Sequence, residues 1–249
     1  MRKLNGQKGL SLIEVTIMLL VLMLLTSVLV PSIFDFIKDA QRVKVKEDCE
    51  AIAVSIARLF RDTNCVAQNG SAVPVDCEIL NIAGILYSDG NEPSIDLVDA
   101  PNFTPAGSTA ECATYNWDDP FDAAPCAAFD TLESQLVRND PAYKTPGALG
   151  FAQNPLPLFT TGWRGAYLAP PIGPDPWGST YLVNTLFLRV ANDANCSGDQ
   201  GCPDYGWHYD TICLSAGEDQ TIETPFAGSG GGTQRGGDDF VTVISGGSR

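Results

Sequence analysis

The first apolar segment of the chain is one uninterrupted block rather than the striped pattern of a surface helix. Residues 10–34 comprise 25 positions with a single charged side chain, Glu14. A helix needs about 20 apolar residues to cross a bilayer, so this block predicts a membrane-spanning helix. Three cations and no acidic residue precede it: Arg2, Lys3 and Lys8. This cationic flank is expected in the cytoplasm, which places the rest of the chain on the other side of the membrane.

A second apolar pattern follows at helical spacing. Hydrophobic residues recur along one side of residues 35–62, at Val45, Cys49, Ile52, Ile56 and Leu59. The spacing predicts a stem helix that continues from the membrane segment to about residue 62, a length of roughly 80 Å at 1.5 Å per residue. A folded domain must cover the one-sided stripe. Pro31 lacks a backbone donor, so it marks a position where the helix is expected to kink or unwind in a filament.

The pattern in the remainder of the chain predicts a small sheet with a long insertion. Residues 63–160 are expected to be loop-rich, with a short apolar run at 79–87 and a short helix at 132–138. Strands are expected within residues 161–249, at 181–190, at its partner 207–214, and at 240–244. The predicted fold class is α+β, with a long N-terminal helical stem packed on a small antiparallel sheet.

Charge is distributed unevenly and limits the choice of partners. The net charge is −15, and residues 62–249 hold six Lys and Arg against 24 Asp and Glu. Such an acidic domain disfavours nucleic acid as a partner and suits hard cations such as Ca²⁺. The single histidine, His208, lies in an expected strand, and no residue pattern predicts an enzyme.

Eight cysteines without a C-x-x-C pair predict up to four disulfides in an oxidising compartment, and they disfavour a zinc site. Sequence proximity favours Cys65 with Cys77 and Cys112 with Cys126. Cys196 and Cys202 could close a short loop on each other. A Cys49–Cys213 bridge from stem to sheet is one candidate by elimination, and two local alternatives stay open beside it, because connectivity cannot be deduced from the sequence.

The start of the apolar block carries a more specific signal. Residues 8–15 read Lys-Gly-Leu-Ser-Leu-Ile-Glu-Val, which resembles the processing motif of type IV pilins and of the pseudopilins of type II secretion. The resemblance implies a leader at residues 1–9, cleavage between Gly9 and Leu10 by a prepilin peptidase, and N-methylation of Leu10. It also implies that Glu14 pairs with the new amino terminus of a neighbouring subunit, and that Pro31 is the family's helix-breaking proline. The alternative is a plain signal-anchor.

A second resemblance lies in the expected sheet region. Residues 162–168 read Gly-Trp-Arg-Gly-Ala-Tyr-Leu and residues 175–178 read Asp-Pro-Trp-Gly. Both segments resemble the major pseudopilin of type II secretion systems. Asp-Pro-x-Gly is also a strong turn sequence, because proline presets its φ and glycine accepts positive φ. Trp163 and Trp177 are expected to pack this turn against the sheet rather than to bind a ligand.

An acidic segment near the C-terminus resembles the calcium loop of the same family. It begins with Ser-Ala-Gly-Glu-Asp at residues 215–219. The resemblance implies carboxylate ligands from Asp219, Asp238 and Asp239, and backbone carbonyl ligands at Ala216 and Glu218. The intervening residues 221–235 are longer than the usual family loop, which leaves the full ligand set open. The alternative is an acidic surface turn followed by a linker.

These patterns together predict a structural subunit of a type IV pilus-like filament, closest to a type II secretion pseudopilus. The expected partners are further copies of the chain, the prepilin peptidase and an inner-membrane assembly platform. The expected location is the inner membrane, with one span and an external C-terminal domain, and then an extracytoplasmic filament. Two alternatives stay open: a subunit of a surface type IV pilus, and a membrane-anchored binding module of a different class.

Overall fold

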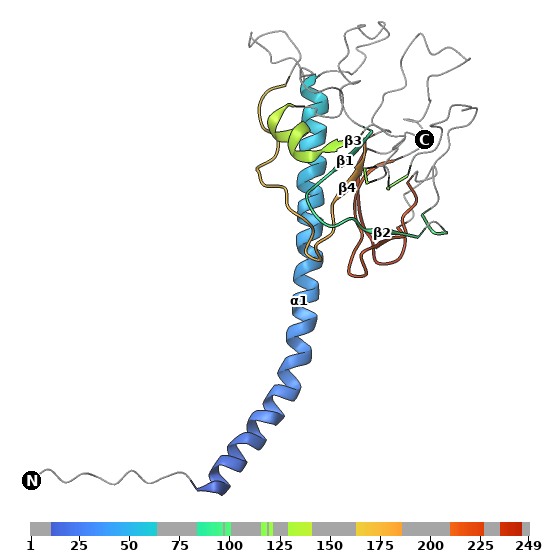
Figure 1. The fold of residues 1–249 in the computed structure, drawn as a ribbon. Helices are drawn as coiled ribbons and strands as arrows, with labels where there is room; N and C mark the ends of the chain where they lie inside the picture. Colours follow the sequence, from blue (N-terminus) through green and yellow to red (C-terminus); the bar gives the residue numbers. More distant parts are fainter. Residues whose placement is uncertain are drawn as a thin grey trace, which may run out of the picture. The chain divides into compact units, whose positions relative to one another are not determined.

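The computed structural model describes residues 11–63, 84–96, 98–100, 116–118, 120–121, 129–140, 163–185, 210–226 and 235–245 (Figure 1). Its elements, in chain order, are α1 (Leu12–Thr63), β1 (Ile85–Tyr87), β2 (Ser94–Ile95), β3 (Phe129–Thr131), η2 (Ser134–Arg138), β4 (Leu182–Asn184), β5 (Thr211–Ser215), β6 (Thr221–Ile222) and β7 (Phe240–Ser245). The chain divides into two compact units, Met1–Lys44 and Val45–Arg249, and each is described separately.

The first unit contains the apolar part of α1. The helix runs without interruption through Pro31, as the sequence predicted, so a break at this proline inside a filament stays a prediction. Its large apolar side chains are exposed all round, for example Leu12 by 82% and Met23 by 70%. Among the described residues, α1 is the one helix long and apolar enough to cross a membrane. It could therefore serve as a membrane anchor or a signal sequence.

The second unit contains a five-stranded sheet with the order β3-β1-β4-β5-β7. The pairs β1–β4, β4–β5 and β5–β7 are antiparallel, which confirms the predicted pairing of β4 with β5 and the final strand β7. The expectation of a purely antiparallel sheet is wrong, because β3 pairs with β1 in parallel. A parallel pair needs a long connection rather than a hairpin, and about 40 residues separate these two strands.

The sheet is not confined to residues 161–249, because β1 and β3 come from the range 63–160 that was expected to be a loop-rich insertion. Each of these strands has only three residues, too few to show an alternating pattern in the sequence. β4 is also shorter than the expected strand 181–190, and residues 186–190 lie outside the described part of the chain.

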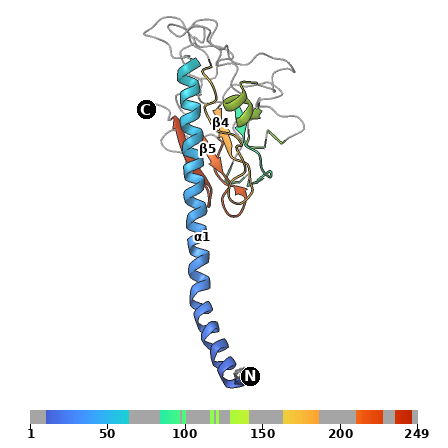
Figure 2. The ribbon, with the colours of Figure 1, turned by 90° about the vertical axis from the view of Figure 1, so that its left-hand side faces the viewer.

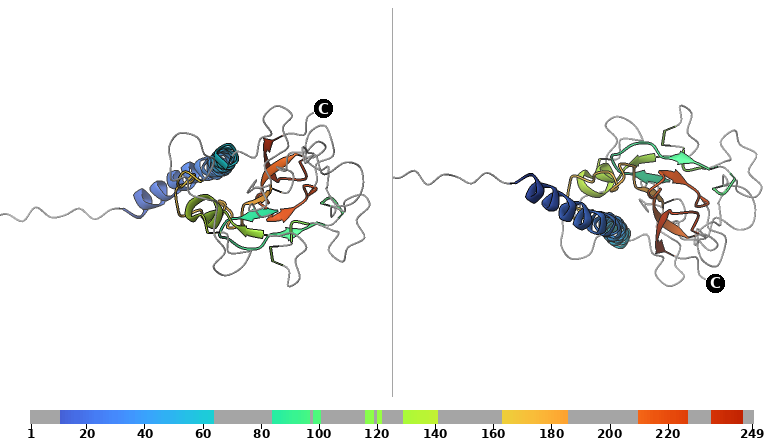
Figure 3. Two further views of the ribbon diagram at one scale, coloured as in Figure 1. Left: turned by 90° about the horizontal axis from the view of Figure 1, so that it is seen from above. Right: turned by 90° about the horizontal axis from the view of Figure 1, so that it is seen from below.

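The C-terminal part of α1 covers one face of the sheet (Figure 2). The predicted stripe is buried as expected, with Val45, Cys49, Ile52, Ile56 and Leu59 each at most 2% exposed. These side chains pack on Leu86, Val183 and Cys213 from three neighbouring strands. Seen from above, this sheet lies to one side of the C-terminal part of α1 (Figure 3). Each fully buried aliphatic side chain contributes about 1.5–3 kcal/mol, so the stripe fixes how the helix joins the sheet.

The opposite face of the sheet is also covered. Ile85, Leu182, Ile212 and Leu214 alternate with the helix-facing residues and form a second core. Trp117 closes this core, packing edge-on against Phe226 with ring centroids 4.8 Å apart. Its indole N–H donates to the Thr224 carbonyl oxygen at 2.9 Å. The described part of residues 63–160 thus contributes two strands to the sheet and helps to cover its far face.

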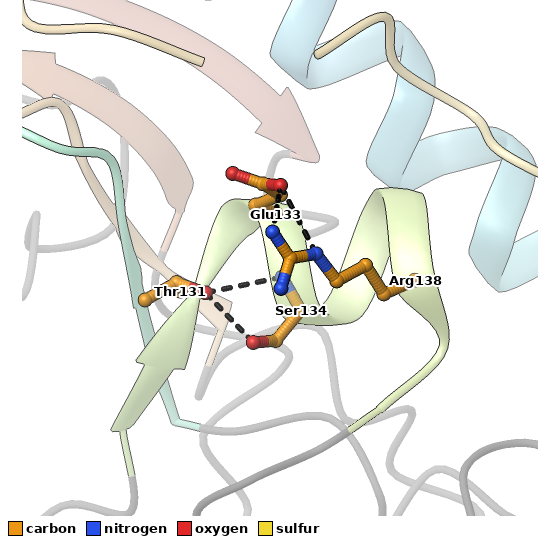
Figure 4. A network of polar contacts seen from close by, with 4 residues as sticks. All are labelled: Thr131, Glu133, Ser134 and Arg138. Carbon is orange, nitrogen blue, oxygen red and sulfur yellow. Dashed lines mark hydrogen bonds and ion pairs between the residues drawn. The ribbon is translucent and has the colours of Figure 1, made fainter. Parts of the chain in front are cut away.

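The predicted short helix at 132–138 is present. Helical turns begin at Leu132 and continue as the π-helical segment η2. One polar contact lies at the start of this segment and a second links its start to its end (Figure 4). The Thr131 hydroxyl donates to the Ser134 hydroxyl at 2.8 Å, and Arg138 forms an ion pair with Glu133. Leu132 and Leu136 point into the core beneath α1, which is why the segment is ordered beside β3.

The Asp-Pro-Trp-Gly segment forms the predicted turn. The Gly178 N–H donates to the Asp175 carbonyl oxygen at 3.0 Å, and Gly178 has a positive φ of 98°. The buried Asp175 carboxylate accepts the Ser179 N–H at 2.8 Å and the Ser215 hydroxyl at 2.7 Å. Burial raises its pKa, and these hydrogen bonds oppose the rise. Trp177 stacks on Phe240, which confirms its packing role.

Candidate functional site

Three carboxylates converge beyond the end of β5. A turn at residues 217–220 follows β5, and the two-residue strand β6 then leads to Glu223. The segment before β7 returns to the same place and supplies Asp238. One carboxylate oxygen from each of Asp219, Glu223 and Asp238 lies within 4.8 Å of the others. The cluster therefore joins two segments that are about 15 residues apart in the sequence.

Asp238 is held in place by the backbone of the turn. Its Oδ2 accepts the Glu218 N–H at 2.7 Å and the Asp219 N–H at 3.3 Å. Gly217, at a positive φ of 72°, allows this approach, because a Cβ there would lie 2.8 Å from Asp238 Oδ2. The second oxygen, Oδ1, is buried and has no hydrogen-bond partner among the described residues. A buried carboxylate oxygen without a partner is costly, so it favours a bound cation or proton.

Glu223 is the member of the cluster that sequence reasoning missed. Its side chain lies against Gly237, where any Cβ would overlap Glu223 Oε2. Desolvation raises the pKa of Glu223, and the charges of Asp219, Asp99, Asp238 and Asp96 raise it further. Among the described residues, no Lys or Arg forms an ion pair with the carboxylates of Asp219, Glu223 or Asp238. Arg235 donates to the backbone carbonyl oxygen of Asp238 at 3.1 Å. A single Glu after a two-residue strand carries no motif, and only the fold places it here.

Asp239 has a different environment from its neighbour. It is fully buried, and its Oδ2 accepts the Glu223 N–H at 2.9 Å and the Thr224 N–H at 2.7 Å. Its Oδ1 has no hydrogen-bond partner in the part of the chain that the structure describes. Burial raises the pKa of Asp239 to about 6, even though the hydrogen bonds oppose the rise. Asp239 is not part of the three-carboxylate group, and it instead ties residues 223–224, which follow β6, to the start of β7.

The two residues expected to offer carbonyls lie beside the cluster. Ala216 is buried directly after β5, and Glu218 is exposed in the turn with its N–H bound to Asp238. Three convergent carboxylate oxygens suit a hard cation, which takes six to eight oxygen ligands in the case of Ca²⁺. The residues fit such an ion in chemistry, with Glu223 as an additional carboxylate.

A second candidate site lies at the start of α1. The Glu14 carboxylate turns back and accepts the Ser11 N–H at 2.9 Å, so it caps the first turn of its own helix. An acidic group here also interacts favourably with the positive end of the helix dipole. Gly9 and Leu10, the predicted processing positions, lie outside the described residues.

One of the expected disulfides lies within the described residues. Cys49 on α1 and Cys213 on β5 form a disulfide, with Cα atoms 5.7 Å apart, which confirms that expectation. The remaining cysteines lie outside the described residues, so their pairings stay predictions: Cys65, Cys77, Cys112, Cys126, Cys196 and Cys202. His208 lies outside them as well.

Comparison with protein-family models, with curated proteins and with solved structures finds no match to this chain.

Proposed function

We propose that this chain is a structural subunit of a type IV pilus-like filament, closest in kind to a type II secretion pseudopilus subunit. The observation that carries the proposal is the contrast along α1. Apolar side chains are exposed all round between residues 12 and 37, whereas from Val45 onward one stripe is fully buried under the sheet. The exposed half requires an apolar environment, and a membrane followed by a bundle of identical helices supplies one.

The proposed route begins with a membrane-inserted precursor. A prepilin peptidase would cleave between Gly9 and Leu10, and Leu10 would be methylated, as the motif at residues 8–15 implies. An inner-membrane assembly platform would then transfer the helix into the growing filament. The Cys49–Cys213 disulfide supports an oxidising, extracytoplasmic location for the second unit, because such bonds are rare in the cytosol.

Glu14 is the proposed assembly contact. A carboxylate in the apolar part of a helix is costly in lipid, so it gains from a cation supplied by another chain. Among the described residues, the hydrogen-bond partner of its carboxylate is the neutral Ser11 N–H. The new amino terminus of a neighbouring subunit would provide a full positive charge at the same depth, and would neutralise Glu14 in the bundle.

We further propose that Asp219, Asp238 and Glu223 bind Ca²⁺. The support is the convergence of three carboxylates and the unpartnered, buried Oδ1 of Asp238. Desolvation and the charges of neighbouring carboxylates raise the pKa of Glu223, and a bound cation would offset both effects. It would also tie the turn after β5 to the start of β7, a structural rather than catalytic role.

Replacement of Glu14 tests the proposed function. We expect Glu14→Ala to insert in the membrane like the wild type but to form no filaments, measured by alkaline extraction of membranes and by sedimentation of sheared filaments. Glu14→Gln is the matched variant, because it keeps an acceptor for Ser11 N–H and removes the charge. Normal assembly of both variants would contradict the proposal.

The same experiment separates the remaining candidates. A surface type IV pilus subunit would behave like a pseudopilin at Glu14 but would form filaments that extend from the cell. A membrane-anchored binding module is favoured only by the length and apolarity of α1. It would form no filaments even in the wild type, and would tolerate Glu14→Ala without loss of activity.

A further inference from the structure

Directly after the apolar block, α1 carries four charged side chains on one face. Asp35, Lys38, Asp39 and Arg42 occupy positions i, i+3, i+4 and i+7, which is the spacing of a single helical face. All four are exposed in the first unit. Their signs alternate along the helix, from negative at Asp35 to positive at Arg42. We call these four residues the charge row.

We propose that the charge row binds the charge row of a second copy of this chain and sets the axial register between neighbouring stem helices. The inference rests on the proposed filament function and adds a register-setting contact to it. The row begins at the end of the exposed apolar segment, where Phe34 precedes Asp35 and Phe36 follows it, with side chains that are 61% and 74% exposed. A second copy that covers those aromatic side chains must also lie beside the row.

The apolar segment alone specifies register weakly. Leu, Val and Met side chains between residues 17 and 30 pack almost equally well at several axial offsets, since dispersion and burial are not directional. Charged groups beside an apolar seam do discriminate, because like charges opposite one another are penalised and opposite charges are favoured. The charge row is therefore suited to choose among offsets that the apolar seam leaves similar in energy.

The alternation makes the row complementary to itself only when it is shifted. Two parallel helices at the same height would place Asp35 against Asp35 and Arg42 against Arg42. A shift of three residues, ~4.5 Å at 1.5 Å per residue, brings Lys38 level with Asp35 and Arg42 level with Asp39 of the other copy. A shift of seven residues, ~10.5 Å, brings Arg42 level with Asp35.

Contacts within one chain do not prevent this exchange of partners. Arg42 Nη1 lies 4.0 Å from Asp39 Oδ1, but both side chains are more than half exposed. Exposed ion pairs of this kind contribute little to stability, so they rearrange at little cost. A neighbouring stem would exclude water from the row and strengthen the pairs that span the two copies.

Complementary charge reversal tests the proposal in the full-length chain. Asp35→Lys with Asp39→Lys makes the row wholly positive, and Lys38→Glu with Arg42→Glu makes it wholly negative. We expect each double variant alone to lower filament yield by at least about tenfold, because like charges then meet at every offset. We expect co-expression of the two variants to restore mixed filaments that contain both chains. Asp89→Lys with Glu92→Lys, at exposed positions of the second unit, is the matched control and should assemble normally.

Each other outcome overturns the inference. Normal filaments from either double variant would show that the row sets no register. Loss of assembly without rescue on co-expression would show that the row contacts something other than a second copy, such as lipid headgroups. Alkaline extraction checks that both variants remain in the membrane. Failure of the wild type to form filaments would instead contradict the proposed function.

Discussion

Cys49 on α1 and Cys213 on β5 are joined by a disulfide that closes 164 residues of chain. Both residues are at most 1% exposed, and they lie in the core between the helix and the sheet. Tyr181 lies on the same side of the sheet, and its hydroxyl donates a hydrogen bond to Asp48 Oδ2 at 2.9 Å. Asp48 directly precedes Cys49 in α1. A covalent bond and a charged hydrogen bond thus attach the helix to the sheet at neighbouring residues.

Removal of the disulfide is expected to destabilise the second unit strongly. A bridge that closes a loop of this length constrains the unfolded chain by about 4–5 kcal/mol in the loop-entropy model. We expect Cys49→Ala with Cys213→Ala to lower the free energy of unfolding by at least about 2 kcal/mol, measured by denaturant titration with tryptophan fluorescence. Reduction of the wild type under denaturing conditions, before the titration, should give a loss at least as large, because it opens Cys49–Cys213 together with any other disulfide of the chain. An unchanged midpoint would contradict the structural role.

Calcium is expected to stabilise the chain through the three-carboxylate cluster. A free ion concentration 100-fold above the Kd adds about 2.7 kcal/mol, which should raise the midpoint of thermal unfolding by roughly 5–10 °C. Asp238→Asn should abolish this rise, because it removes a ligand charge while keeping an acceptor for Glu218 N–H. Glu223→Gln should weaken it, and Glu47→Gln on the exposed side of α1 is the control. If the midpoint of thermal unfolding of the wild type is the same in Ca²⁺ as in a chelator, the site is ruled out.

The metal-free chain is expected to lose stability as the pH rises through the range set by Asp239. Its pKa of about 6 in the folded state lies above the ordinary value of 3.8. Between these values the folded chain binds more protons than the unfolded chain, so stability falls as the pH increases from about 4 to about 6. The shift corresponds to about 3 kcal/mol at most.

Asp239→Asn isolates this contribution, because Asp130 and Asp175 also have raised pKa values owing to burial. The asparagine oxygen can still accept the N–H groups of Glu223 and Thr224. Denaturant titrations at several pH values should therefore show a shallower pH dependence in the variant. Parallel curves for the variant and the wild type would mean that Asp239 does not titrate in this range.

The sequence by itself determined the elements whose signal is local and long. The block at residues 10–34 and the stripe from Val45 to Leu59 repeat over many turns, so they predicted α1 with its buried side. The Asp-Pro-Trp-Gly turn and the last strand were also predictable, because their residues restrict the backbone directly.

Only the tertiary structure decided the features that depend on distant partners. The three-residue strands β1 and β3 are too short to show an alternating pattern in the sequence. β1 pairs with β4 along one edge, and β3 pairs in parallel with its other edge. Glu223 joins Asp219 and Asp238 because β6 and the segment before β7 bring them together. Asp238 and Asp239 are adjacent in the sequence, yet one carboxylate enters the cluster and the other is buried against the backbone of Glu223 and Thr224. Burial and hydrogen bonding from remote segments separate these two side chains, and no local pattern records those interactions.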